Sequence, residues 1–332
     1  MSPIKAISLF SGGLDSSLAV KLIQSEGIEV IGFHFVLPFY TPMDEPILRI
    51  EKLSKELGIE IEFFYGGEDY IQIIKNPKYG YGENMNPCID CKIFMLKKAK
   101  IFMEKIGASF LFSGEVLNQR PMSQRKNVMN LIEREAGVKG LLLRPLSAKL
   151  LEITIPEKRG WVKRENLLAL SGRTRKQQFA LAERFEIKNY ATPSGGCYLT
   201  DPQYSLRLKE AFQHEEDKIE DLRLLRIGRH FRLKNGAKLI IGRDKKENEL
   251  IENLANEEDF LIEGVGFGSP LGLLKKSKDE MDIELAASIC MRYSKKRKEK
   301  SVRVIIRNKN KNLKEKEVTP MDKRKVEEFL IR

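Results

Sequence analysis

The amino-acid sequence predicts an α/β fold with a doubly wound parallel sheet, followed by a second, smaller α+β unit. In the first 64 residues, short apolar segments alternate with amphipathic ones in the order strand, helix, strand, helix, strand. This is the pattern of a parallel sheet whose ligand lies at the carboxyl ends of the strands. After about residue 220, alternating apolar and polar positions at 229–233 and 237–242 predict strands of a different unit.

The first unit begins with a strand at residues 6–10 that runs into a glycine-containing loop at 11–17. The helix that follows carries Leu14, Leu18 and Leu22 on one face. The next expected elements, in chain order, are strand 29–35, helix 46–57, strand 60–64, a loop rich in Gly, Asn, Pro and Tyr at 65–87, helix 92–106, and strands at 109–113 and 141–146.

The second unit is expected to follow a polar connector at residues 203–220. Its remaining elements are predicted as a polar helix at 245–255, a strand at 259–264, a Gly-rich turn at 264–270 and a helix at 281–292. The expected domains are therefore residues 1–202 and 221–332, and two domains suit a chain of 332 residues.

The chain is basic, with 59 Lys and Arg against 47 Asp and Glu and a pI near 9.3. Between residues 291 and 325, 15 basic residues accompany 4 acids, which predicts a basic C-terminal tail. Further basic residues are Lys92, Lys97, Lys98, Lys100, Arg173, Arg175 and Lys176. Separated basic sites favour a polyanion as partner, with a solvated tail as the alternative. Charges interrupt every apolar run, so we expect no membrane span and a cytoplasmic protein.

The loop at residues 11–17, SGGLDSS, has the features of a phosphate-binding loop between a strand and a helix. Its glycines let the backbone approach a ligand, so that N–H groups and the hydroxyls of Ser11, Ser16 and Ser17 can converge on one anion. The N-terminus of the following helix adds a partial positive charge of about half a unit. A Walker loop would need a Lys before the last Ser, and the G-x-G-x-x-G spacing of dinucleotide-binding folds is absent.

This loop resembles the PP-loop, S-G-G-x-D-S, of the ATP pyrophosphatases. The resemblance implies an adenine nucleotide alpha hydrolase-like fold, ATP with its pyrophosphate in the loop, and adenylation of a substrate carbonyl oxygen. Asp15 would help to hold Mg²⁺ or order the loop. The residues expected to bind the nucleotide are Ser11, Gly12, Gly13, Asp15, Ser16, Ser17, Gly114 and Gln119.

Four cysteines do not form a disulfide framework in a chain of this size. Cys88 and Cys91 form a C-x-x-C motif, and Cys197 lies in a second glycine turn. The pattern suits a zinc site, a redox dithiol, or three ligands of a 4Fe-4S cluster with one iron open for sulfide. A loop cysteine at a helix start can also have a depressed pKa, which suits a persulfide carrier. Cys290 lies on an apolar helix face and is expected to be inert packing.

Further motifs resemble the tRNA thiolation enzymes among the PP-loop proteins. Residues 86–88 (NPC) and 194–197 (SGGC) look like the two cysteine turns of the 2-thiouridylases, and residues 113–124 look like the matching element of the 4-thiouridine synthetases. The three cysteines are similar to those of cluster-dependent 2-thiouridine enzymes. These features cover about residues 4–200.

The second unit resembles the RNA-binding domain of the NFACT proteins. The resemblance rests on residues 233–248 (LKNGAKLIIGRDKKEN), 268–270 (GSP) and 282–287 (DIELAA), which occur in the same order. It implies that a folded basic module captures RNA.

Together these resemblances imply an ATP-dependent tRNA sulfurtransferase with tRNA as partner. A uridine oxygen would attack the α-phosphate of ATP, and sulfur would then displace AMP. The sulfur donor would be sulfide on an open cluster iron or a persulfide on Cys197, supplied by a carrier such as a cysteine desulfurase and resolved by Cys88 or Cys91. Two alternatives stay open: a PP-loop enzyme of small molecules, and an RNA-binding factor with a vestigial nucleotide site.

Overall fold

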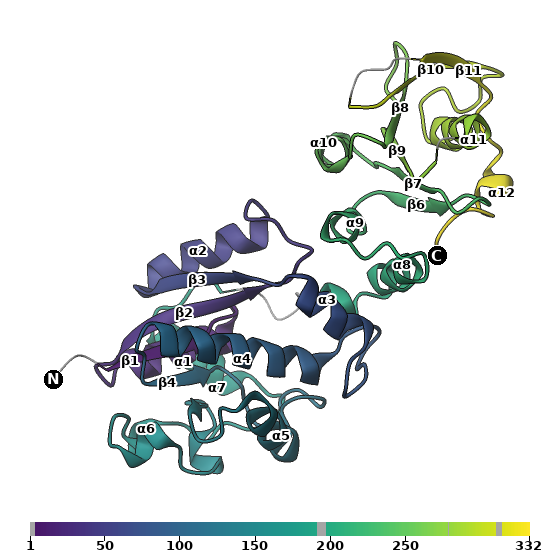
Figure 1. The fold of residues 1–332 in the computed structure, drawn as a ribbon. Helices are drawn as coiled ribbons and strands as arrows, with labels where there is room; N and C mark the ends of the chain where they lie inside the picture. The colour runs from purple at the N-terminus through teal and green to yellow at the C-terminus, as the bar shows by residue number, and fades with distance from the viewer. Residues whose placement is uncertain (1–3, 191–196, 278, 310–313) are drawn as a thin grey trace. The chain divides into compact units, whose positions relative to one another are not determined.

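A computed structural model describes residues 4–190, 197–277, 279–309 and 314–332 (Figure 1). The chain divides into two compact units, Met1–Thr200 and Asp201–Arg332. Residues 203–220, predicted as a connector, lie in and after helix α8 (Pro202–Gln213) and belong to the second unit. Within the described ranges, no helix is both long and apolar enough to cross a membrane.

The first unit is built on a five-stranded sheet in the order β3-β2-β1-β4-β5 (Figure 1), and all its neighbouring strands pair in parallel. The strands are β1 (Lys5–Leu9), β2 (Glu29–Val36), β3 (Glu60–Tyr65), β4 (Phe110–Ser113) and β5 (Leu142–Leu143). The predicted doubly wound parallel sheet is confirmed. The chain moves outward from β1 to β3 and then returns to β4 on the other side of β1. Loops diverge where the strand order reverses, so the crevice between β1 and β4 is where such sheets bind ligands.

Helices cover both faces of this sheet. Side chains alternate between faces along a strand, so Phe110 and Phe112 pack with α1 and α2 while Leu111 packs with α4 and α5. The helices of the first unit are α1 (Leu14–Gln24), α2 (Glu45–Leu57), α3 (Glu68–Lys75), α4 (Cys88–Lys105), α5 (Lys126–Ala136), α6 (Ile155–Lys158) and α7 (Lys176–Arg184).

Several features of the first unit differ from the sequence-based expectation. The predicted loop at 65–87 contains α3, whose Tyr70, Ile71 and Ile74 are buried at helical spacing. Helix α4 begins at Cys88 rather than at residue 92. Helices α5, α6 and α7 were not predicted, and the strand expected at 141–146 is limited to Leu142–Leu143. The short apolar stripe of α3 lies between segments rich in Gly, Pro and Asn, which hide its periodicity.

The second unit is an α+β fold around a six-stranded antiparallel sheet in the order β11-β10-β8-β9-β7-β6. Its strands are β6 (Arg229–Arg232), β7 (Lys238–Ile241), β8 (Phe260–Gly264), β9 (Gly272–Lys275), β10 (Val302–Arg307) and β11 (Lys314–Val318). Its other helices are α9 (Ile219–Leu224), α10 (Lys245–Leu254), α11 (Glu280–Met291) and α12 (Lys323–Val326).

The segment predicted as a basic tail folds into this sheet. In β10, Val302, Val304 and Ile306 are buried while Arg303 is exposed, so the strand alternates as expected for a sheet with one face on the core. The high density of Lys and Arg masked this alternation in the sequence.

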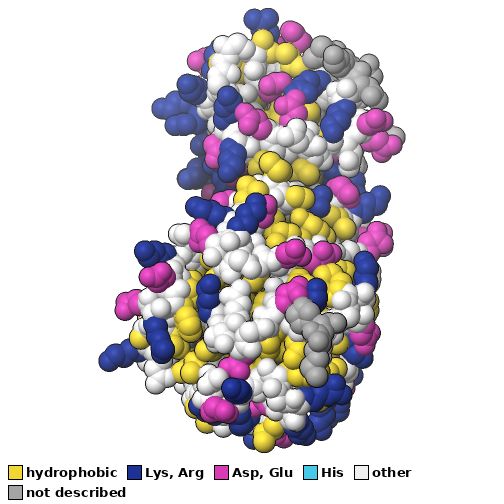
Figure 2. All heavy atoms as spheres, turned by 90° about the vertical axis from the view of Figure 1, so that its left-hand side faces the viewer, with side chains coloured by type: hydrophobic (Ala, Val, Ile, Leu, Met, Phe, Trp, Pro, Cys, Tyr) yellow, Lys and Arg dark blue, Asp and Glu magenta, His cyan; other side chains and the backbone are white. Residues whose placement is uncertain are grey.

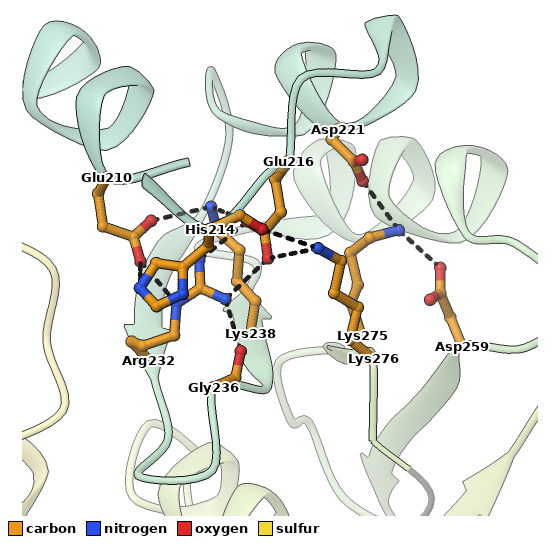
Figure 3. A network of polar contacts seen from close by, with 10 residues as sticks. All are labelled: Glu210, His214, Glu216, Asp221, Arg232, Gly236, Lys238, Asp259, Lys275 and Lys276. Carbon is orange, nitrogen blue, oxygen red and sulfur yellow. Dashed lines mark hydrogen bonds and ion pairs between the residues drawn. The ribbon is translucent and has the colours of Figure 1, made fainter. Parts of the chain in front are cut away.

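Buried charges attach α8 and the segment after it to the same sheet (Figure 3). Glu216, which is 1% exposed, accepts hydrogen bonds from Arg232 on β6 at 2.7 and 2.9 Å and from Lys238 on β7 at 2.9 Å. Lys275 lies between Asp221 and Asp259 at 3.3 and 3.0 Å. These contacts explain why the predicted connector folds as part of the second unit.

Candidate functional site

The predicted phosphate loop lies at the carboxyl end of β1, at the crevice between β1 and β4. Gly12 has a φ of 69°, and a Cβ there would lie 2.8 Å from Cγ1 of Ile50, so this position requires glycine. The hydroxyls of Ser16 and Ser17 donate to the Gly13 carbonyl at 2.9 and 3.1 Å. The turn is therefore held by its own side chains.

Ser11 is the exposed hydroxyl of this loop, and it donates to Ser16 Oγ at 3.2 Å. Ser16 and Ser17 are buried below it. The surface of the loop that a ligand can reach is thus formed by Ser11 and by backbone at the start of α1, as a phosphate site at a helix N-terminus requires.

Asp15 connects the loop to two distant segments. Its Oδ2 accepts a hydrogen bond from Gln119 Nε2 at 2.7 Å, and Gln119 Oε1 in turn accepts one from Gln178 of α7 at 3.1 Å. The other carboxylate oxygen, Oδ1, is buried and has no hydrogen-bond partner among the described residues. Arg175 lies at the start of α7, with its guanidinium 4.0 Å from Asp15 Oδ2.

Gly114 brings the end of β4 against the start of α1. A Cβ at Gly114 would lie 2.4 Å from the carbonyl carbon of Asp15 and from the nitrogen of Ser16. Such a close approach of two backbones is compatible with glycine alone. The structure therefore brings Gly114 and Gln119 to the loop, with whose residues the sequence-based prediction grouped them. The contacts of Gln178 and Arg175 were missed, because no local pattern links residues so far apart in the chain.

The two cysteine turns meet in the first unit. Asn84 Nδ2 donates to the Thr200 carbonyl at 2.7 Å, and the Met85 amide donates to the Leu199 carbonyl at 3.1 Å. Residues 194–196 of the predicted late turn lie outside the described residues. Cys197 lies close enough to Cys88 for the charge of the Cys88 thiolate to raise its pKa. The charges of Cys197 and Cys88 likewise raise the pKa of Cys91. The three predicted site cysteines therefore share one region.

Tyr70 lies beside this group. Its hydroxyl donates to Cys91 Sγ at 3.0 Å, and Met95 Sδ lies 3.7 Å from the same sulfur. Tyr70 is fully buried in α3, a helix that was predicted as loop, so sequence reasoning missed this contact.

A depressed pKa, which a loop cysteine at a helix start can have, is found at none of the three site cysteines. Burial raises the pKa of Cys91 to about 12, although the Tyr70 hydroxyl opposes this, and burial raises the pKa of Cys197 to about 11. Burial also raises the pKa of Cys88, with Lys92 and Arg120 opposing it. Desolvation disfavours the thiolate more than a helix N-terminus or nearby cations favour it. Burial therefore favours the neutral thiol at each of these three positions.

Glu115 connects the cysteine region to the crevice. It follows Gly114 and accepts from Arg144 Nε at 2.9 Å, and it forms an ion pair with Lys92, the residue after Cys91. Burial and the charges of nearby arginines lower the pKa of Lys92 to about 7. The phosphate loop and the cysteines thus belong to one polar region at the carboxyl edge of the sheet.

The basic residues of the first unit contribute less exposed charge than predicted. Lys92, Lys98 and Lys100 each form an ion pair within the unit. The exposed members of the set are Lys97, Arg173 and Lys176. Figure 2 shows one face of the molecule, on which Lys and Arg side chains lie among acidic ones rather than in one continuous basic surface.

No group of three or more His, Cys, Asp or Glu side chains in the described part of the chain is placed to hold a metal ion. Cys290 is fully buried in the core of the second unit, in agreement with the prediction that it is inert packing. A cluster differs from a single ion in that each cysteine binds a different iron, so its ligands need not converge on one point. Three thiols in one region fit this kind of ligation in number and residue type.

Two family matches divide the chain in the same way as the sequence motifs. Residues 2–152 match the family described as Thiamine biosynthesis protein (ThiI), and residues 228–330 match the family described as NFACT protein RNA binding domain. The two resemblances that the motifs indicated are confirmed. Residues 2–152 and 228–330 are thus similar to these two families, in that order along the chain.

Curated relatives match the first unit. A "Probable tRNA sulfurtransferase" of Methanothermobacter thermautotrophicus is 28% identical over 145 residues, which are 43% of this chain and 36% of the relative. A tRNA-specific 2-thiouridylase MnmA of Nitratiruptor sp. is 30% identical over 118 residues, which are 33% of this chain and 34% of the relative. The chain spans about a third of the length of these relatives.

Among solved structures, the U34-tRNA thiolase NcsA from Methanococcus maripaludis, determined with its 4Fe-4S cluster, is similar to this chain at 21% sequence identity. The match covers 68% of this chain and 72% of that chain with a TM-score of 0.35.

Proposed function

We propose that this protein is an ATP-dependent tRNA sulfurtransferase. The observation that carries the proposal is that the phosphate loop and the three cysteines share one polar region at the carboxyl edge of the parallel sheet, joined through Glu115 and Lys92. One enzyme that activates a carbonyl oxygen with ATP and then inserts sulfur needs both groups within reach of the same base. Relatives named tRNA sulfurtransferase and 2-thiouridylase support this function.

In the first step the loop holds ATP, with its phosphates on the exposed Ser11 hydroxyl and on the backbone of residues 12–17 at the start of α1. The hydroxyls of Ser16 and Ser17, which were expected to bind the anion, are instead buried and donate to the Gly13 carbonyl. The uridine oxygen forms a bond to the α-phosphorus while the bond from that phosphorus to the bridging oxygen breaks. Pyrophosphate leaves with the electron pair, and the base loses its ring N–H proton. Asp15, held by Gln119, orients the loop and offers its unpartnered Oδ1 to Mg²⁺.

In the second step sulfide attacks the activated carbon, the carbon–oxygen bond breaks and AMP leaves. Cys88, Cys91 and Cys197 would hold a 4Fe-4S cluster, which when bound supplies an iron without a protein ligand that accepts sulfide. The hydroxyl of Tyr70 holds Cys91 in place, and the contacts of Asn84 and Met85 keep the two cysteine turns together.

The second unit would supply RNA binding, with a catalytic domain at Met1–Thr200 and an RNA-binding domain at Asp201–Arg332. The NFACT-type match and the surplus of basic residues support this division. The target base must leave its stack to reach the crevice, which costs a few kcal/mol. The tRNA substrate and the free thiols suit the reducing cytoplasm.

A second sulfur route uses the same cysteines without a cluster. Cys197 lies close enough to Cys88 for the charge of the Cys88 thiolate to raise its pKa, so Cys197 would carry a persulfide that Cys88 or Cys91 can reach. The outer sulfur would attack the activated carbon and release AMP. A thiol of Cys88 or Cys91 would then attack Cys197 Sγ, freeing the thiolated base and leaving a disulfide that a thiol reductant must reopen.

Two measurements test the proposal. The full chain is purified without oxygen and its iron and sulfide contents are determined. The protein is then incubated with ATP, sulfide and unmodified tRNA, and the nucleosides are analysed by mass spectrometry. Thiolated uridine and an iron-containing protein are expected. Thiolation by iron-free protein with a persulfide carrier, a cysteine desulfurase and cysteine, in place of sulfide would replace the cluster by the persulfide route. Absence of thiolated nucleoside from an iron-loaded protein that binds ATP would contradict the function, and ATP cleavage without RNA would favour a small-molecule enzyme.

A further inference from the structure

A segment outside both family matches reaches the phosphate loop. Residues 153–227 lie between the two matched ranges. Within this interval, Ser171 forms an isolated parallel bridge with Leu117, and the Gly172 amide donates to the Leu117 carbonyl at 2.8 Å. Leu117 follows β4 by four residues. This contact directs the chain before α7 to the crevice between β1 and β4.

Buried side chains then hold α7 to the loop. Gln178 is 1% exposed and donates to Gln119, which donates to Asp15. A buried amide costs free energy unless it is hydrogen-bonded, so this chain of contacts specifies one position of α7 relative to α1. The residues that precede Gln178 on α7 are thereby placed at the phosphate loop.

Arg175, the N-cap residue of α7, is one of the residues placed at the phosphate loop in this way. Its side chain is 23% exposed, and its guanidinium lies 4.0 Å from Asp15 Oδ2, beyond hydrogen-bond distance. Within the described residues the guanidinium makes no hydrogen bond to another side chain. Its donors are therefore available to a ligand, and the planar guanidinium fits phosphate oxygens in a bidentate geometry.

We propose that Arg175 binds the β- and γ-phosphates of ATP and stabilises pyrophosphate as it leaves. This inference rests on the proposed function for its reaction, while the binding site stands on the geometry of the loop. When the bond between the α-phosphorus and its bridging oxygen breaks, the electron pair passes to the β-phosphate oxygen. A cation already placed beside the loop stabilises this charge without reorganising the site.

The charge of Asp15 favours a cation on the side of Oδ2, in addition to the Mg²⁺ proposed for Oδ1. A carboxylate beside the phosphate loop repels the anion that the loop binds, and its Oδ1 has no partner among the described residues. Arg175 compensates this charge from the side of Oδ2. Arg173, two residues earlier, is exposed and has no contact with the loop in the described structure, so it provides a matched control.

Titration calorimetry of the full-length protein with pyrophosphate and, separately, with AMP tests the proposal. Arg175→Gln should weaken pyrophosphate binding by about tenfold to a hundredfold, the range expected for charge-assisted hydrogen bonds, and leave AMP binding unchanged. Arg175→Lys should retain part of the affinity, because it keeps the charge and loses the bidentate geometry. Arg173→Gln should bind both ligands as the parent does.

Unchanged pyrophosphate binding by Arg175→Gln would overturn the proposal. An equal loss for pyrophosphate and AMP would also overturn it, since that pattern indicates a structural role. Because no tRNA or sulfur donor is present, the result does not depend on thiolation. A protein that loses pyrophosphate selectively but never thiolates tRNA would keep Arg175 in its site and refute the sulfurtransferase function alone.

Discussion

Each unit of this protein buries a group of charged and polar residues, and the two groups differ in how completely they are paired. In the second unit, Glu216 accepts three hydrogen bonds from Arg232 and Lys238 (Figure 3). In the first unit, one buried carboxylate oxygen of Asp15 has no hydrogen-bond partner among the described residues. One guanidinium nitrogen of Arg144 is also buried there without a partner.

The comparison separates structural charge from reactive charge. A buried ion group whose donors and acceptors are all paired specifies one packing and has no capacity left for a ligand. A buried polar atom without a hydrogen-bond partner destabilises the apo protein, and such atoms are found at binding and catalytic sites.

Replacement of the site cysteines should have the largest effect. Cys88→Ser, Cys91→Ser and Cys197→Ser should each reduce tRNA thiolation to background, because each removes a sulfur ligand or a sulfur carrier, while ATP affinity stays unchanged. Nucleoside mass spectrometry and calorimetry with ATP measure the two properties. Cys290→Ala, in the core of the second unit, is the control and should still thiolate. Full thiolation by a variant would remove that cysteine from the site.

Breaking the paired group should cost stability rather than chemistry. Glu216→Gln should lower the free energy of unfolding by about 3 kcal/mol, because the buried Arg232 and Lys238 keep only one of the two carboxylates that balance their charge, Glu210. Glu280→Gln is the matched control, since Glu280 also pairs with two lysines but is exposed, and it should hardly change the unfolding midpoint. Thermal unfolding of the full chain compares them, and equal losses would contradict the argument from burial.

Close backbone packing at the loop predicts an intermediate effect. Gly114→Ala should destabilise the first unit by about 2 kcal/mol and weaken ATP binding, because its Cβ would displace the start of α1. Gly67→Ala is the control, since the nearest atom, Asp69 Oδ1, lies at an ordinary 3.5 Å from its Cβ. Denaturant unfolding and calorimetry measure both variants. Similar behaviour of the two would argue against a tight contact at Gly114.

Acid should affect the paired group gradually. Burial alone would raise the pKa of Glu216, but hydrogen bonds from Arg232 and Lys238 outweigh it and lower the pKa to about 2. Since this lies below the ordinary value of 4.5, the stabilisation is present above about pH 4.5 and is lost as the pH falls toward 2. The midpoint of thermal unfolding should therefore fall more steeply in this window for the parent than for Glu216→Gln. Parallel curves would show that Glu216 does not contribute.

Local patterns in the sequence predicted the parallel sheet well, because strand and helix periodicities and the loop at residues 11–17 are encoded by neighbouring residues. They failed at α3 and β10. In α3 the apolar stripe is short, and in β10 buried valines alternate with basic side chains that suggested a tail. In both cases burial against the rest of the unit, rather than propensity, decides the structure.

The candidate site was also predicted only in part from local sequence. By itself, the sequence determined the residue types of the site: a glycine loop with hydroxyls at a helix start, and three cysteines in two turns. Only the tertiary structure decided that Gln119 and Gln178 hold Asp15, that Arg175 reaches the loop, and that Tyr70 contacts Cys91. It also decided the direction of the cysteine pKa values, because desolvation depends on what packs around a thiol. Side chains a hundred residues apart meet through the topology of the sheet, and no local periodicity records such a meeting.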